Sequence, residues 1–174
     1  MLNLLVNIPS EQKVFLAHVR LAMEQYFGED QRRVDHALQV TRYAQELLAY
    51  IEADPVLTLT SAYLHDIGIP EAERKHGSNA GKWQELEGPP VTRDLLAGLG
   101  AEPAFVDRVA DIVGNHHTFC GVDSPEFRII WDADALVNFA ALLPTKNAEQ
   151  AESILKQHMV TEPGFQLARK IFIQ

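Results

Sequence analysis

The chain has 174 residues, a length at which a single domain can bury a substantial core. Its hydrophobic fraction of 47% and charged fraction of 22% are ordinary for a globular protein and exclude a disordered or fibrous chain. The formal net charge of -9 argues against a nucleic-acid polymer as the main partner, because a protein that neutralises phosphates needs a basic surface. A small phosphorylated ligand remains compatible with this charge, since a bound dication supplies positive charge locally.

Cysteine content and the N-terminal run bear on the cellular compartment. Cys120 is the only cysteine, so an internal disulfide is excluded and a reducing cytoplasm is the expected location. Residues 1–9 lack a basic segment and are too short to cross a membrane. We therefore expect neither a signal peptide nor a membrane anchor there, but an arm that packs on the domain. The oligomeric state stays open, with a homodimer as one alternative.

Helical periodicity dominates the chain, because apolar residues recur at intervals of three and four. Pro55 suits the first turn of a helix that ends near His65 and Asp66. The glycines and the proline of residues 67–81 predict a loop with a short helix. Longer helices are predicted, in chain order, at about residues 11–27, 30–52, 55–66, 90–99, 103–115, 125–143, 148–158 and 163–173. No alternating β pattern or internal repeat is visible, so the sequence predicts one all-α domain over residues 1–174.

The adjacent residues His65 and Asp66 are the most informative feature of the chain. Imidazole and carboxylate together suit divalent first-row metals. A histidine on an apolar helical face is more often a core residue with satisfied nitrogens, and this alternative applies to both His65 and His36. Asp66 is harder to explain in this way, because a carboxylate after an apolar helical stretch is costly to bury without a partner. A metal ion is one such partner.

Two aspartates interrupt the otherwise apolar helix predicted at residues 125–143, at positions Asp132 and Asp134. Residues two apart point to different faces of a helix, so only one of them is expected to face the core. Asp134 is flanked by Ala133 and Ala135, which leave room for neighbouring helices, and is the preferred ligand. Asp132 is the alternative ligand, or else it accepts a hydrogen bond or caps a turn.

The order His36, His65, Asp66 and Asp134 resembles the H…HD…D signature of the HD superfamily of metal-dependent phosphohydrolases, which is all-helical. The run LHDIG is similar to the second motif of that family, and the run ADAL to its last motif. The resemblance covers about residues 30–140 and implies an HD-type helical bundle on which the N- and C-terminal helices pack. It also implies that the four named residues hold a first divalent ion, with Mn, Fe, Co, Ni and Mg left open.

A second metal ion is suggested by His116 and His117, which close the helix predicted at 103–115. A favourable interaction with the helix dipole is the structural alternative. The pair resembles the paired-His motif of the HD-GYP branch, although the Gly-Tyr-Pro signature itself is missing. Glu87 stands where that branch has a third histidine, and is either a carboxylate substitute or an N-terminal helix cap. If two ions bind, the resemblance implies Asp66 as the bridging or water-orienting residue.

Basic residues that follow the HD pair are candidate phosphate contacts, with an exposed polar segment as the alternative for each. They are Lys75, His76, Lys82 and Arg93. The resemblance implies hydrolysis of a nucleotide or another small phosphorylated metabolite by metal-activated water. An HD-type di-iron oxygenase and a non-catalytic nucleotide-binding module are the alternatives.

Overall fold

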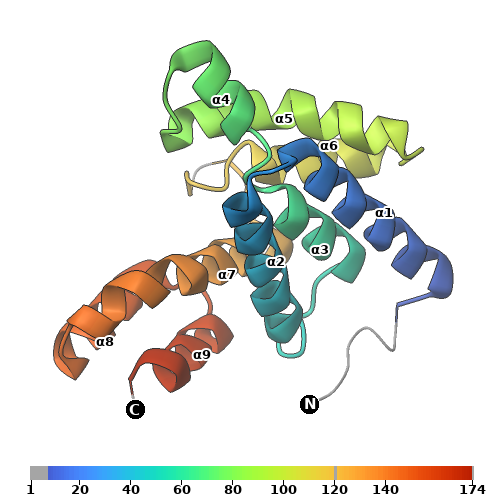
Figure 1. Ribbon diagram of the computed structural model, residues 1–174. Coiled ribbons are helices and arrows are strands. Elements are labelled where there is room, and N and C mark those ends of the chain that lie inside the picture. Colours follow the sequence, from blue (N-terminus) through green and yellow to red (C-terminus); the bar gives the residue numbers. More distant parts are fainter. Residues whose placement is uncertain (1–7, 120, 174) are drawn as a thin grey trace.

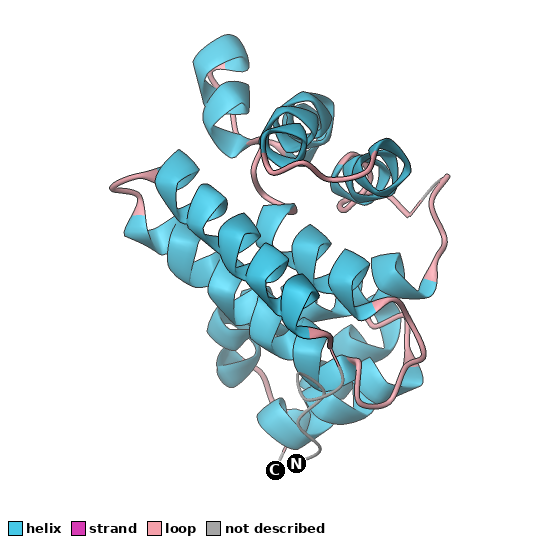
Figure 2. Cartoon of the chain, turned by 90° about the vertical axis from the view of Figure 1, so that its right-hand side faces the viewer, coloured by secondary structure: helices cyan, strands magenta, loops and turns pink. Residues whose placement is uncertain are grey.

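The computed structural model describes residues 8–119 and 121–173. Cys120 and residues 1–7 of the expected packing arm therefore lie outside the described residues, whereas Ile8 is buried in the core. Within the described ranges the chain consists of helices and loops without a strand, which confirms the all-α prediction (Figure 2). No helix of these ranges is long and apolar enough to cross a membrane.

The helices follow one another in the order shown in Figure 1. They are α1 (Ser10–Phe27), α2 (Gln31–Leu47), α3 (Pro55–Leu64), α4 (Ile69–His76), α5 (Gly81–Gly98), α6 (Pro103–Val113), α7 (Pro125–Leu142), the short 3-10 helix η2 (Leu143–Thr145), α8 (Ala148–His158) and α9 (Glu162–Phe172).

Helix α3 lies at the centre of the bundle and is buried around most of its circumference (Figure 1). Its sequence is apolar or hydroxylated throughout, and α1, α2, α6 and α7 all pack against it. Such a helix is stable only when neighbours cover every side. Asp54 fixes its start, because the carboxylate accepts hydrogen bonds from the backbone N–H groups of Val56 and Leu57. The chain therefore delivers the residues that follow α3, including the HD pair, into the interior of the molecule.

Helix α5 begins at Gly81, nine residues before the start predicted at Pro90, and the prediction was wrong there. Pro89 and Pro90 lie inside the helix, where a proline normally removes a backbone hydrogen bond to the residue four positions earlier. The two carbonyls affected belong to Glu85 and Leu86, and Leu86 is 56% exposed. Water can reach the Leu86 carbonyl, whereas the Glu85 carbonyl lies toward Gly114 at the end of α6.

The last two helices extend the bundle beyond α7. Helix α9 packs on α7 and α8 packs on α9, at one end of the molecule in Figure 1. A second, smaller hydrophobic cluster joins them and contains Leu136, Leu143, Leu155 and Ala168. The bounds of α8 agree with those predicted from the sequence, and those of α9 differ by one residue at each end.

Gly68, two residues after Asp66, lets the turn after α3 touch α5. A Cβ atom at this position would lie 2.6 Å from the backbone nitrogen of Gly88 and even closer to the carbonyl oxygen of Gln84. Both neighbours are backbone atoms and cannot move aside independently. A glycine is therefore required here for close packing, and the contact fixes the turn that carries the HD pair.

We expect Gly68→Ala to lower the free energy of unfolding by about 1–3 kcal/mol, because the added methyl group overpacks a rigid contact. Urea denaturation followed by circular dichroism measures the change. Gly98→Ala is the matched control, because a Cβ at Gly98 meets no heavy atom within 4 Å and α5 is expected to be unchanged or slightly more stable. Equal stability of the two variants would contradict the role of Gly68.

Candidate metal centre

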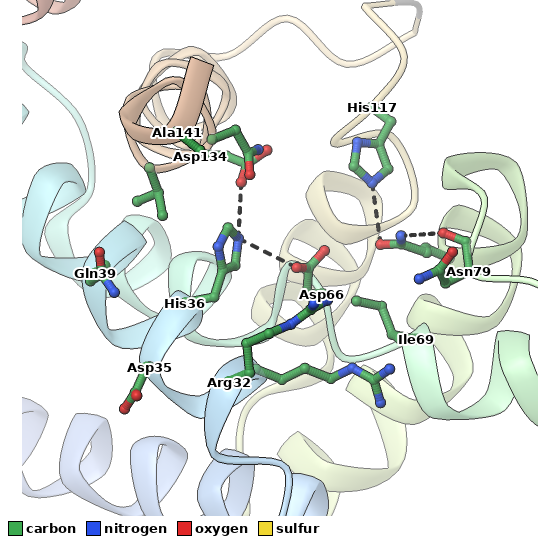
Figure 3. Close-up of a pocket in the computed structure, with 14 residues that line it drawn as sticks. Arg32, Asp35, His36, Gln39, Asp66, Ile69, Asn79, His117, Asp134 and Ala141 are labelled. Atoms are coloured by element: carbon green, nitrogen blue, oxygen red, sulfur yellow. Dashed lines mark hydrogen bonds and ion pairs between the residues drawn. The ribbon is translucent and has the colours of Figure 1, made fainter. Parts of the chain in front are cut away.

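Four side chains from three parts of the chain converge at the end of α3. His36 comes from α2, His65 and Asp66 directly follow α3, and Asp134 comes from α7. The Nε2 atom of His36 lies 3.0 Å from Asp134 Oδ1 and 3.4 Å from Asp66 Oδ2. Dashed lines mark both contacts in Figure 3. The Nε2 atom of His65 lies 3.5 Å from Asp66 Oδ2 and 3.7 Å from Asp134 Oδ1. The structure thus brings together the residues of the predicted first metal site.

The hydrogen bond of His65 determines which of its ring nitrogens faces this cluster. Its Nδ1–H donates to the carbonyl of Ala62 at 2.8 Å, so Nε2 carries the lone pair. This Nε2 lies 3.2 Å from Nε2 of His36. Ligands on one ion with bonds of about 2.0–2.2 Å are separated by roughly 3–3.5 Å. The donor atoms of His36, His65 and Asp66 therefore have about the spacing of ligands around a single ion, and Asp134 Oδ1 lies beside the two histidine nitrogens.

Without a metal ion, the cluster is balanced by protons. Burial alone would lower the pKa of His65, but the charge of Asp66 and the hydrogen bond and charge of Asp134 outweigh it and raise this pKa to about 9. Burial also opposes the charged carboxylates, yet the histidines hold the pKa of Asp66 and Asp134 well below the usual range. The site therefore strongly favours bound positive charge.

Asp66 also belongs to a second group, which it forms with His116 and His117. While its Oδ2 faces His36 and His65, its Oδ1 lies 3.4 Å from His116 Nε2. His116 is buried, and its Nδ1–H donates to the carbonyl of Val113 at 2.7 Å. Its Nε2 then has no hydrogen-bond partner among residues 8–119 and 121–173. A buried lone pair that faces a carboxylate oxygen is satisfied by a cation placed between the two atoms.

Gln84 of α5, which was not predicted as a site residue, contacts the side chain of His117. Its side-chain amide donates to the carbonyl of Asn79 at 2.7 Å, which directs its Oε1 toward His117 Nε2 at 3.2 Å. Burial, with the neighbouring charge of His116, lowers the pKa of His117. The amide thus orients the imidazole of His117 without adding charge.

Glu87 does not take the position expected for it beside the histidine pair. It lies one turn after Gln84 within α5, so it is not an N-terminal cap. Its carboxylate bonds to Lys75 Nζ and to His76 Nε2, the latter at 2.8 Å, and Lys75 followed by His76 lowers its pKa. These contacts join α4 to α5 and leave Glu87 outside both metal-binding groups.

The four predicted phosphate contacts also lie elsewhere. Lys75 and His76 are held by Glu87, Lys82 stacks on the ring of Trp83, and Arg93 bonds to Asp107. None of the four lines the cavity of about 660 Å³ that contains His36, Asp66, His117 and Asp134. The basic residues that do line it are Arg32 and Arg33, one turn before His36 (Figure 3). Their position one turn before His36 in the sequence could have identified them as residues near the metal centre.

Asp132 has a structural role, as one of its predicted alternatives proposed. Its Oδ1 accepts a hydrogen bond from the backbone N–H of Val160 at 2.8 Å. Its Oδ2 accepts from the backbone N–H and the hydroxyl of Thr161, at 3.0 and 2.6 Å. Burial nevertheless raises the pKa of Asp132 to about 6. Asp132 thus joins α7 to the turn before α9, and Asp134 is the aspartate that reaches the histidines.

Comparison with known proteins agrees with this geometry. Residues 33–138, more than half of the chain, match the HD domain family. The chain belongs to the HD domain family. The fold of this HD protein is similar to the crystal structure of a predicted HD superfamily hydrolase from an uncultured Thermotogales bacterium. That likeness has a TM-score of 0.61 and 23% identity, and covers 91% of this chain and 83% of the other. None of the curated proteins compared matches the chain.

The two aspartates of α7 give a matched pair of variants. Asp132→Ala is expected to lower the free energy of unfolding by about 1–3 kcal/mol, because it leaves buried donors without an acceptor, and to leave metal affinity unchanged. Asp134→Ala is expected to weaken metal binding by at least about 100-fold, since it removes an oxygen that faces two histidines. Thermal unfolding and calorimetric titration with Mn²⁺ measure the two effects. If Asp132→Ala lost metal binding while Asp134→Ala kept it, Asp132 rather than Asp134 would be the ligand.

Proposed function

We propose that this HD protein is a metal-dependent phosphohydrolase that acts on a nucleotide or another small phosphorylated metabolite. The arrangement of Asp66 carries the proposal. One of its oxygens faces His36 and His65 and the other faces His116, at the wall of a cavity that also contains two arginines. Such a site presents two groups for cations together with positive charge for a phosphate.

The donor set fits divalent ions. Mn, Fe, Co, Ni and Zn bind a mixed set of imidazole nitrogens and carboxylate oxygens better than do ions that prefer ligands made of oxygen alone. We propose that His36, His65, Asp66 and Asp134 hold a first ion, and that Asp66, His116 and His117 hold a second. The backbone carbonyls of Ala62 and Val113 orient His65 and His116, as partners of metal-binding histidines commonly do.

Divalent ions bound at these groups would lower the pKa of a coordinated water and polarise the phosphoryl oxygens. In the reaction, the water oxygen forms a bond to phosphorus while the bond from phosphorus to the leaving oxygen breaks. The attacking water releases a proton to solvent, and the leaving oxygen keeps the electron pair of the broken bond and takes up a proton from solvent. Asp66 would orient the attacking water from the position between the two groups.

Arg32 and Arg33 contribute to phosphate binding in different ways. Arg33 bonds to Glu73 at 2.7 Å and pairs with Asp30 at 3.1 Å, and its side chain is only 16% exposed. It therefore joins α2 to α4 and shapes the cavity wall. Arg32 is exposed, and no ion pair holds it within the described residues. We propose that Arg32 contacts the phosphate of the substrate.

Metal binding is the first test. The double variant His65→Ala/Asp66→Ala is expected to lose bound metal, because it removes one ligand of the first group and the carboxylate shared with the second. Elemental analysis after dialysis against Mn²⁺ measures the loss, and circular dichroism checks that the helices remain. Wild-type protein that neither carries nor binds a divalent ion would contradict the proposed site.

Catalysis is tested by phosphate release from a panel of nucleotides and sugar phosphates with Mn²⁺ or Ni²⁺. Arg32→Gln is expected to raise KM by about tenfold or more, since it removes a charged hydrogen bond to phosphate. Arg93→Gln is the matched control, because Arg93 lies outside the cavity, and its KM is expected to equal that of the wild type. Oxygen consumption by the iron-loaded protein without phosphate release would instead favour the di-iron oxygenase alternative.

A further inference from the structure

A second, smaller cavity adjoins the metal-binding groups on the side of α7 that faces α8. It has a volume of about 180 Å³ and shares His117, Asp134 and Asn138 with the main cavity. Its other lining residues are His116, Ala135 and three aromatic side chains, those of Trp131, Phe139 and His158. We call this cavity the aromatic recess. The main cavity has no aromatic ring in its lining apart from its histidines.

The recess is formed by the spacing of residues on α7. Trp131, Ala135 and Phe139 are four residues apart, so their side chains lie along one face of the helix. The methyl group of Ala135 is too small to fill the space between the two larger rings. The recess lies in that space. Asn138, exposed at the boundary with the main cavity, offers an amide there.

The end of α8 closes the recess and holds its rings in place. The indole N–H of Trp131 donates to the backbone carbonyl of His158 at 3.0 Å. The imidazole of His158 meets the ring of Phe139 edge to face, with centroids 5.5 Å apart. Phe119 packs edge-on against Trp131, at 5.5 Å between ring centroids. The indole nitrogen is thus already bonded, and Trp131 offers its ring surface rather than a polar donor to the recess.

The far wall of the recess lies beyond the part of the chain that matches the HD domain. The family match ends at residue 138, whereas Phe139 and His158 come after it. The metal-binding residues all lie within the match. Part of the recess therefore comes from residues outside the family match, beside a site whose candidate ligands lie within it.

We propose that the aromatic recess binds a planar aromatic group of the substrate, as in the base of a nucleoside phosphate, while the phosphate lies at the metal groups beside Arg32. This inference rests on the proposed function for the position of the phosphate. The volume suits one ring system rather than a whole ligand, since complete small-molecule sites are typically 300–1,000 Å³. Aromatic side chains bind nucleic-acid bases by stacking, and this binding depends little on which base is present.

Binding is tested with ligands that differ only in the base, namely the four nucleoside 5′-monophosphates and ribose 5-phosphate. The chain has two tryptophans, so the Trp83→Phe variant leaves Trp131 as the only one and makes its fluorescence a reporter of the recess. At least one nucleotide is expected to quench this fluorescence and to bind about 5- to 150-fold more tightly than ribose 5-phosphate. Equal binding of all five ligands would overturn the proposal.

Variants of the recess locate the binding. His158→Ala, at an exposed position, and Phe139→Leu, which keeps apolar volume, are expected to remove most of the advantage of the nucleotide over ribose 5-phosphate. Tyr50→Ala is the matched control, because Tyr50 is 74% exposed and lines neither cavity. An unchanged advantage in both recess variants would overturn the proposal. Because binding is measured without turnover, nucleotide-selective quenching with no phosphate release would refute the hydrolase function and leave the recess assignment standing.

Discussion

The rest of the site depends on two carboxylates, Asp66 and Asp134, placed at the end of the buried helix α3. Their side chains are only 16% and 15% exposed, so water cannot compensate their charge. His36, His65 and His116 approach them from α2, from the end of α3 and from the end of α6. In a metal-free protein His65 compensates part of this charge by binding a proton, as its raised pKa shows. Divalent ions would replace that proton and satisfy the nitrogen of His116 that has no partner within the described residues.

Packing of the helices makes this convergence possible. Helices α2, α6 and α7 each pack against α3, and each carries histidine or aspartate side chains to the same end of it. Gly68 brings the turn after α3 against α5, and Asp132 holds α7 to the start of α9. The positions of the metal-binding groups therefore follow from contacts that are themselves structural. The C-terminal helices extend the same arrangement, because α8 supplies a wall of the aromatic recess.

Local signals allowed most of the fold to be predicted. Asp54 and Pro55 mark the start of α3, and apolar spacing marks the long helices, which have the order expected from the sequence. The start of α5 was missed because Pro89 and Pro90 suggest a helix start, whereas in the structure the helix continues through both prolines. Because of the same error, Glu87 was expected at a helix start, and the contact of Gln84 with His117 was not predicted.

The site was predictable where side-chain type and spacing suffice. His36, His65, Asp66 and Asp134 lie together as their motif order implied, and Asp134 rather than Asp132 faces the histidines. The phosphate contacts were not predictable from charge alone, because Lys75 and His76 are held by Glu87 through contacts between two helices. Whether a basic residue faces a cavity or an acidic partner depends on such packing.

Asp66 belongs to both groups of side chains that could hold a metal ion. Electron paramagnetic resonance of the protein saturated with Mn²⁺ tests this shared role most directly, because two ions bridged by one carboxylate interact magnetically. We expect two Mn²⁺ per chain with the spectrum of a coupled pair. A single Mn²⁺ per chain with the spectrum of an isolated ion, at saturation, would contradict it.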